Sequence, residues 1–194
     1  MRTKICGITS YEDAMLAINA GADALGFVFY EKSPRYLSPI VAKEIIHKLP
    51  PFIEKVALFV NVKAEEVDQI CTMVGATLAQ IHFEATDEFY QQLKTPHIKV
   101  IRAKSKEDIR KYTDEYRLVD AFCESFGGAG KRINIEWFDD VDCSKIILAG
   151  GLSADNVASL KEYGFYGVDV SSGVELSYGK KDPQKVEDFI INAK

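Results

Sequence analysis

The sequence has no long apolar run. None of its stretches approaches the roughly 20 consecutive apolar residues that a membrane-spanning helix needs, and residues 1–7 lack the apolar core of a secretory signal. Positive charge is also scarce, because 24 Lys and Arg stand against 29 Asp and Glu and give a formal net charge of −5. Nucleic acids and anionic membranes attract basic surfaces. We therefore expect a cytoplasmic protein that binds neither a nucleic acid nor a membrane.

Patterns that bind metals or redox cofactors are missing as well. The cysteines lie far apart and form no C-x-x-C pair, and the three histidines have no metal-ligand spacing. The glycine fingerprint G-x-G-x-x-G of dinucleotide-binding folds does not follow the first predicted strand. We expect free thiols, no metal and no cofactor. The four cysteines are Cys6, Cys71, Cys123 and Cys143.

What the sequence does contain is a regular alternation of short apolar runs with amphipathic segments. Its 194 residues, 47% of them apolar, predict one domain over residues 1–194. Most of the runs are rich in Val, Ile, Leu or Phe on both faces, which is typical of parallel strands covered on both sides. The eight predicted strands are 2–6, 24–29, 55–60, 78–82, 98–102, 117–121, 145–149 and 166–170.

The segments between the strands carry helix start and stop signals. Ser10 and Ser153 are candidate N-caps, and Gly21, Gly75 and Gly164 each end a predicted helix shortly before a strand begins. Repeated strand–helix units give parallel strands, and eight of them predict an α/β fold with a single compact (β/α)8 TIM barrel. The alternative is an open, doubly wound sheet. The predicted helices include 11–20, 41–48, 154–163 and 183–192, with a short one at 136–141.

Several polar side chains follow predicted strands at the end where barrel enzymes place their active sites, the carboxyl end. Cys6 ends the first strand, and His82 ends the fourth. Asp120 and Asp169 lie near the ends of the sixth and eighth, and Arg35 follows the second. The sequence therefore predicts that a thiol and two carboxyl groups face one mouth of the barrel.

Small residues fill the turns after the seventh and eighth strands. Gly150 and Gly151 follow one strand, and Ser171, Ser172 and Gly173 follow the other. Glycines let backbone N–H groups approach a ligand, hydroxyl groups add donors, and this pair of turns is the usual phosphate site of a barrel. We expect the two turns to bind a phosphate group. The alternative is that the glycines only make tight turns.

A glycine-rich segment, 126–131, follows the sixth strand. It differs from a P-loop because Ser125 occupies the first glycine position and Arg132 replaces the Ser or Thr that binds Mg²⁺. Closely spaced glycines give a loop freedom to hinge. We interpret the segment as a loop that closes over a bound substrate, the alternative being an exposed connector.

Motifs along nearly the whole chain resemble those of the phosphoribosylanthranilate isomerase family and occur in the family's order. The first and the last are the most specific. One departure follows the fourth strand, where Phe83 stands in place of the family's glycine. The matching segments are KICGIT (4–9), GFVF (26–29), SPRY (33–36), GGAGK (127–131), LAGGL (148–152) and VDVSSGVE (168–175).

The resemblance implies an enzyme of tryptophan biosynthesis, an isomerase that carries out the Amadori rearrangement of a phosphosugar, N-(5-phosphoribosyl)anthranilate, without a cofactor. It implies Cys6 as the general base and Asp120 as the general acid. We expect Arg35, His82 and Asp169 to bind the substrate, with the guanidinium on the anthranilate carboxylate. The protein is expected to be a monomer or a homodimer.

The reaction itself needs one acid and one base. A proton on the ring oxygen opens the furanose and leaves an iminium at C1, and the iminium makes the C2 hydrogen acidic enough for a base to remove. Ordinary thiols hold their proton at neutral pH, and ordinary aspartates do not. We therefore expect the site to raise the pKa of Asp120, and to lower that of Cys6 or favour its proton exchange with the substrate. Lys4 either assists Cys6 as a nearby cation or is a structural lysine paired with a carboxylate.

Two other interpretations stay open at this point. The aminoaldose isomerase of the histidine pathway uses the same barrel, but an aspartate would be expected in place of Cys6, together with a second phosphate site. A non-catalytic barrel that binds phosphosugars would keep the glycine turns and have no use for both Cys6 and Asp120.

Overall fold

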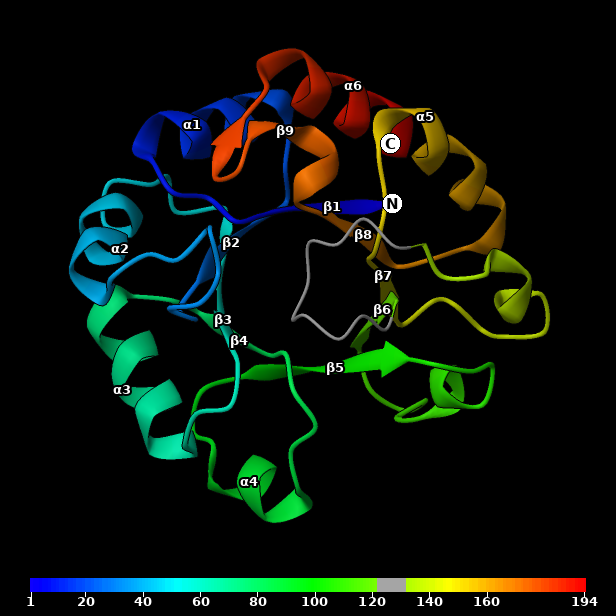
Figure 1. Cartoon of the computed structure of the whole chain (residues 1–194), viewed down its shortest axis with the longest axis horizontal. Coiled ribbons are helices and arrows are strands. Elements are labelled where there is room, and N and C mark those ends of the chain that lie inside the picture. Colours follow the sequence, from blue (N-terminus) through cyan, green and yellow to red (C-terminus); the bar gives the residue numbers. More distant parts are fainter. Residues whose placement is uncertain (122–131) are drawn as a thin grey trace.

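A computed structural model describes residues 1–121 and 132–194 and contains a closed barrel of eight parallel strands. Each strand pairs with the next in sequence order, and β8 pairs with β1 to close the ring (Figure 1). The predicted (β/α)8 barrel is confirmed, and the open sheet is excluded. The strands are β1 (Arg2–Cys6), β2 (Ala24–Val28), β3 (Glu54–Phe59), β4 (Leu78–Ile81), β5 (His97–Ala103), β6 (Arg117–Ala121), β7 (Ile146–Leu148) and β8 (Gly167–Val170).

Helices surround the barrel on its outside (Figure 1). The first begins and ends as predicted, because the Ser10 side chain accepts a hydrogen bond from the Asp13 N–H at 3.1 Å and Gly21 ends the helix with a φ of 101°. No helix in the described ranges is long and apolar enough to cross a membrane. The α-helices are α1 (Tyr11–Ala20), α2 (Pro39–Ile46), α3 (Ala64–Val74), α4 (Asp87–Gln92), α5 (Ala154–Val157) and α6 (Pro183–Ala193).

The structure corrects one predicted helix and adds a hairpin. The predicted helix 154–163 divides into α5 and a 3-10 helix, η3 (Ala158–Tyr163). Ser159 there donates its hydroxyl to the Asn156 carbonyl at 3.0 Å, a side-chain bond that competes with regular helix bonding. The glycine-rich segment 126–131 and Cys123 lie outside the described residues. The remaining elements are η1 (Asp108–Arg110), η2 (Ile135–Phe138), η4 (Ser172–Val174), β9 (Glu175–Ser177) and β10 (Lys180–Lys181).

Apolar side chains form a large layer outside the strands and two smaller clusters inside the barrel. Successive side chains of a strand point to opposite faces, so Ile5 packs toward the helices while Cys6 faces the interior. The outer layer includes three fully buried phenylalanines, Phe27, Phe59 and Phe189. The inner clusters are Cys6, Val28, Leu58 and Val60 on one side and Ile98, Val100, Leu118 and Ala149 on the other.

The hairpin β9–β10 is hydrogen-bonded to the segment that follows β1. The Lys181 N–H donates to Asp13 Oδ2 at 3.0 Å, and the Thr9 hydroxyl donates to the Gly179 carbonyl. Because α1 and the hairpin are tied in this way, two charged residues of the hairpin, Glu175 and Lys181, are buried beside the carboxyl ends of β1 and β8.

Candidate active site

The thiol of Cys6 lies buried at the carboxyl end of β1. Gly26 of the neighbouring strand β2 makes room for it, because a Cβ at position 26 would lie 2.6 Å from Cys6 Sγ and 3.1 Å from Lys4 Nζ. Any side chain there would displace the sulfur or the ammonium. The structure therefore places the thiol where the sequence predicted it, in a space that only glycine leaves open.

Lys4 and Asp169 form a buried ion pair next to this thiol. The two residues face each other in the β1–β8 ladder, and Nζ lies 2.8 Å from Oδ1. The pairing of Lys4 with a carboxylate is thus confirmed, and its charge also acts to lower the pKa of Cys6, so the two interpretations of Lys4 hold together. Burial raises the pKa of Cys6 above its ordinary value, although the charges of Lys4 and Lys181 oppose this. The expectation of a lowered thiol pKa is wrong for this site, because desolvation outweighs the nearby cations.

The pKa of Asp120 is higher than that of an ordinary aspartate. Burial, together with the negative charge of Asp169, raises its pKa to about 7. A carboxyl group with this pKa keeps part of its protons at neutral pH and can therefore act as an acid. The expected direction of this shift is confirmed.

His82 and Asp120 face each other across the interior. His82 Nε2 lies 3.7 Å from Asp120 Oδ2, which is too long for a hydrogen bond. Burial lowers the pKa of His82 to about 3, so that the ring is neutral. Its Nδ1 lies 3.2 Å from the amide nitrogen of Gln80, and Nδ1 accepts this hydrogen bond in the tautomer that carries the ring proton on Nε2. Among the described residues Nε2 has no hydrogen-bond partner. A neutral imidazole nitrogen therefore faces the acid.

Arg35 is held in the mouth by a buried carboxylate. Its Nε and Nη2 each donate to Glu175 at 2.7 Å. The chain passes close by at Gly7, where φ is +73° and a Cβ would lie 2.4 Å from Arg35 Cδ. One edge of the guanidinium is thus occupied by Glu175, and a substrate carboxylate can bind only to the other edge, formed by Nη1 and the second N–H of Nη2.

The two turns proposed to bind phosphate are packed against each other. Gly150 and Gly151 have φ values of 92° and 62°, in the left-handed region that favours glycine. A Cβ on Gly173 would lie 1.9 Å from the Leu152 carbonyl oxygen, so the backbones of the two turns are in contact. The buried Ser171 hydroxyl has no hydrogen-bond partner in the described part of the chain. The turns form one continuous backbone surface at the mouth, with Ser172 at the start of η4.

Comparison with known proteins decides which family this geometry belongs to. The family model described as N-(5'phosphoribosyl)anthranilate (PRA) isomerase matches residues 3–192. The N-(5'-phosphoribosyl)anthranilate isomerase of a Nitratiruptor species is 61% identical over 194 residues, which are 100% of this chain and 99% of that protein. This chain belongs to the phosphoribosylanthranilate isomerase family. The resemblance seen in the motifs, including the family's isomerase class, is confirmed.

Solved structures of phosphoribosylanthranilate isomerases match the whole barrel. The enzyme of Thermotoga maritima has a TM-score of 0.90 and 36% identity, covering 100% of this chain and 98% of that one. A phosphoribosylanthranilate isomerase in complex with reduced 1-(o-carboxyphenylamino)-1-deoxyribulose 5-phosphate has a TM-score of 0.85 with the same identity and coverage.

Sequence reasoning missed two residues of this isomerase mouth, Glu175 and Lys181. Glu175 was part of the last motif, and the signal for its role was an acidic residue directly after a buried valine. Lys181 gave no such signal, because β10 has only two residues and was not predicted. No cluster of three or more His, Cys, Asp or Glu side chains in residues 1–121 and 132–194 is arranged to hold a metal ion.

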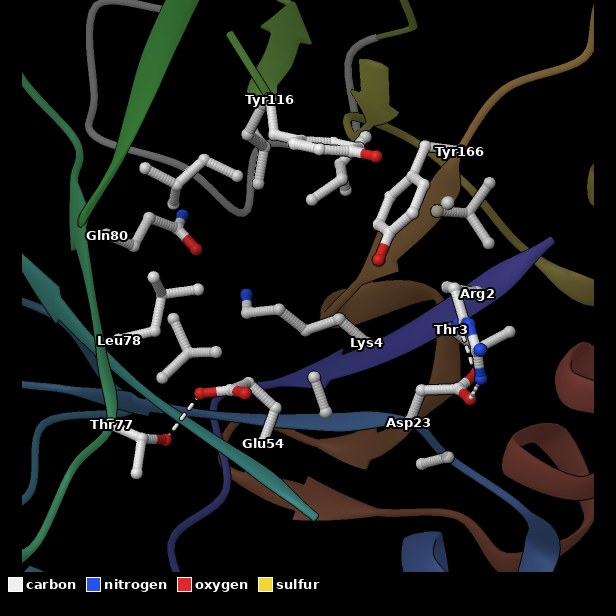
Figure 2. Close-up of a pocket in the computed structure, with 18 of the residues that line it drawn as sticks. Arg2, Thr3, Lys4, Asp23, Glu54, Thr77, Leu78, Gln80, Tyr116 and Tyr166 are labelled. Atoms are coloured by element: carbon white, nitrogen blue, oxygen red, sulfur yellow. Dashed lines mark hydrogen bonds and ion pairs between the residues drawn. The ribbon is translucent and has the colours of Figure 1, made fainter. Parts of the chain in front are cut away.

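A separate cavity of about 670 Å³ opens at the other end of the isomerase barrel, between the amino ends of the strands. Figure 2 shows Tyr116 and Tyr166 on one side of it and the Arg2–Asp23 ion pair on another. Lys4 and Gln80 lie at its inner end and are shared with the polar interior of the barrel. The cavity therefore shares with the mouth Lys4, which lies beside Cys6, and Gln80, which contacts His82.

Proposed function

We propose that this chain catalyses the Amadori rearrangement of N-(5-phosphoribosyl)anthranilate to 1-(2-carboxyphenylamino)-1-deoxyribulose 5-phosphate, a step of tryptophan biosynthesis in the cytoplasm. Residues 1–194 act as one catalytic domain. The observation that carries the proposal is the pairing of a buried thiol with a carboxyl group whose pKa is about 7. Both groups lie at the carboxyl ends of strands and interact with the same Lys4–Asp169 pair.

Asp120 is the general acid. It donates a proton to the ring oxygen of the furanose, the C1–O bond breaks, and an iminium forms at C1. At neutral pH a substantial part of Asp120 is protonated because its pKa is raised to about 7. The Nε2–H of His82 faces the same carboxyl group and binds an oxygen of the sugar there, or of the carboxylate once the proton has left.

Cys6 is the general base. Its thiolate removes the proton from C2, the electron pair of that bond forms the enolamine, and tautomerisation gives the ketone. The thiol is buried and its pKa is raised, so the thiolate forms in a small fraction of molecules. Lys4 and Lys181 are the cations that favour this fraction. The acid and base steps move protons within the substrate and need no cofactor.

The remaining residues hold the substrate. Arg35 binds the anthranilate carboxylate through the edge of its guanidinium that Glu175 leaves open. Asp169, fixed by Lys4, accepts a hydrogen bond from a ribose hydroxyl. The phosphate binds to the backbone and hydroxyl groups of the two turns, namely Gly150, Gly151, Ser171, Ser172 and Gly173.

The loss of substrate fluorescence tests this proposal. The wild-type protein is expected to convert N-(5-phosphoribosyl)anthranilate, and Cys6→Ser and Asp120→Asn are each expected to lower kcat/KM by about 10²–10⁴-fold. Cys71→Ser is the matched control, because Cys71 is buried on α3 outside the barrel. Full activity in both active-site variants would refute the roles of the two residues. Conversion of the doubly phosphorylated aminoaldose of the histidine pathway instead would refute the substrate.

A further inference from the structure

A chain of three buried charged side chains lies behind the mouth of the barrel. Arg35 binds Glu175 through two hydrogen bonds of 2.7 Å, and Lys181 Nζ binds Glu175 Oε1 at 3.0 Å. The Lys181 side chain is 0% exposed and that of Glu175 is 5% exposed. Burying three charges costs free energy unless each is well paired. Since a surface hairpin such as β9–β10 has no need of a buried lysine, the cost suggests a function for this group.

The ammonium of Lys181 also binds the backbone of two strands. Nζ donates to the Cys6 carbonyl at 2.6 Å and to the Ser171 carbonyl at 3.3 Å. Cys6 is the last residue of β1, Ser171 directly follows β8, and these two strands are adjacent in the barrel. Together with Glu175, Lys181 thus uses its three donors on three acceptors.

On this basis we infer that Lys181 is a positioning residue for the proposed isomerase reaction. Its ammonium ties the end of β1, which carries the proposed base Cys6, to the turn after β8, which is proposed to bind the phosphate. Glu175 extends the same connection to Arg35 and the substrate carboxylate. One buried cation therefore sets the spacing between the base and two anionic groups of the substrate. The expected effects on kcat and KM rest on the proposed function, whereas the hydrogen bonds that Lys181 makes do not.

The electrostatic consequence concerns the thiol itself. The charged groups around Cys6 are Lys4 and Asp169 from β1 and β8, Lys181 from β10 and Arg35 from the loop after β2. The positive charge of Lys181 lowers the pKa of Cys6 and so opposes the effect of burial. Without this cation the thiolate fraction is expected to fall.

The test compares Lys181→Met with Lys180→Met. Lys180 belongs to the same hairpin, but its ammonium is exposed and lies 3.8 Å from Asp13. For Lys181→Met we expect kcat to fall and KM to rise, each about tenfold, and the alkaline limb of the kcat/KM profile to move to higher pH. For Lys180→Met we expect both constants within twofold of wild type. Lys181→Met with unchanged constants and an unchanged profile would overturn the inference.

A second readout does not depend on the isomerase activity. Alkylation of Cys6 by iodoacetamide, followed peptide by peptide with mass spectrometry at pH 8.5, reports the thiolate directly. We expect about tenfold slower alkylation in Lys181→Met, as for a pKa shift of about one unit, and no change in Lys180→Met. If the wild type shows no isomerase activity but alkylation responds in this way, the proposed function fails while the role of Lys181 stands.

A further variant protects the test against misfolding. Lys181→Met alone leaves Glu175 paired with Arg35 only, and breaking a buried ion pair destabilises a protein. The double variant Lys181→Met/Glu175→Gln removes one charge of each sign and keeps the net charge of the group. It is expected to unfold cooperatively and to show the same losses in kcat and KM, because the connection between β1 and the turn after β8 is still missing. Its alkylation rate should return toward the wild-type value, because Glu175 no longer offsets the charge of Arg35 near Cys6. Wild-type kcat and KM in a folded double variant would also overturn the inference.

Discussion

At the carboxyl end of the strands Asp120 is largely buried near the carboxylate of Asp169, whereas at the amino end Asp23 accepts hydrogen bonds from several donors. Asp23 accepts hydrogen bonds from the Thr3 N–H at 2.9 Å and from Arg2 at 2.7 Å. Although partial burial opposes them, these bonds hold the pKa of Asp23 below its ordinary value. Asp120 instead has its pKa raised to about 7. The two ends of one barrel therefore give the same residue type opposite properties.

The ion pairs of the two ends differ in the same sense. The side chains of Lys4 and Asp169 are 7% and 9% exposed, whereas those of Arg2 and Asp23 are 68% and 22% exposed. Exposed pairs contribute little to stability and cost little to form, while buried charges are expensive. The free-energy cost of burying charged side chains is therefore greatest at the mouth of the barrel. This difference indicates that the charges of the amino end cost the barrel little, whereas the buried charges of the carboxyl end serve a purpose other than stability.

The largest expected effect comes from comparing two glycines, Gly173 after the carboxyl end of β8 and Gly164 before its amino end. For Gly173→Ala, the turns after β7 and β8 must separate by about 1 Å, because a Cβ would lie 1.9 Å from the Leu152 carbonyl, where real Cβ atoms essentially never come closer than 3.0 Å. Displacements of about 1 Å at a substrate-binding site cost roughly 100-fold in rate. We expect kcat/KM to fall by at least that factor, measured from the loss of substrate fluorescence.

Gly164→Ala is the matched change before β8 begins. Gly164 has a φ of +69° but nothing lies within 4 Å of a Cβ there. The substitution introduces strain of about 1–2 kcal/mol without a collision, so the melting temperature should fall by a few degrees while kcat/KM stays within twofold. Equal losses of activity in the two variants would contradict the separation between the ends.

The pH dependence of the free energy of unfolding compares Asp120 with Asp23, and the expected effects are of intermediate size. Asp120→Asn removes a carboxylate that the folded protein ionises only with difficulty. The folded pKa of about 7 lies above the unfolded value, so the penalty grows as pH rises from about 4 and is complete above about pH 7. We expect Asp120→Asn to stabilise the protein at pH 8 by an amount on the order of a few kcal/mol, with little effect at pH 4.

Asp23→Asn should act in the reverse direction. The folded pKa of Asp23 lies below the unfolded value, so its contribution is present above the unfolded pKa and is lost as pH falls through the folded one. We expect this variant to lower the melting temperature at pH 8 and to have less effect near pH 3. Urea unfolding at the extremes of pH measures both changes. Destabilisation by Asp120→Asn at pH 8 would contradict the proposed cause of its pKa.

The sequence was sufficient for the parts of the site that follow from strand ends. Because parallel strands of a barrel end at the same mouth, Cys6 and Asp120 could be placed there without knowing any contact between them. Of the two expectations for Cys6, the lowered pKa was wrong, because it followed from the need for a base and from one neighbour in the sequence, Lys4; proton exchange with the substrate stays a prediction. The sequence around Cys6 shows neither how deeply the thiol is buried nor that Asp169 neutralises Lys4.

The Arg35–Glu175–Lys181 group could not be predicted for a related reason. Its bonds join residues that are 140 and 175 positions apart in the chain, Arg35 with Glu175 and Lys181 with Cys6. The hairpin that carries Glu175 and Lys181 has strands of three and two residues, too short for a periodic pattern. Only the closed barrel brings these positions together.

The smallest expected effect is a shift of the pH profile. Because Asp120 loses its proton more easily than Cys6, the active form, a protonated carboxyl group with a thiolate, is a minor form of the singly deprotonated site. kcat/KM should therefore rise with pH, with an apparent pKa of about 7 that reflects Asp120. It should fall only at the higher pH at which Cys6 also ionises. Burial is the main cause of the raised pKa of Asp120, and the negative charge of Asp169 is the second.

Asp169→Asn should move this rising limb to lower pH by up to about one unit. Two causes act together, since the negative charge disappears and the ammonium of Lys4 is no longer neutralised. The height of the profile will fall as well, because Asp169 is proposed to bind the substrate, so the position of the limb is the informative quantity. Asp23→Asn, at the other end of the barrel, should leave that position unchanged. A limb that stays in place in Asp169→Asn, or moves to higher pH, would show that Asp120 does not control it.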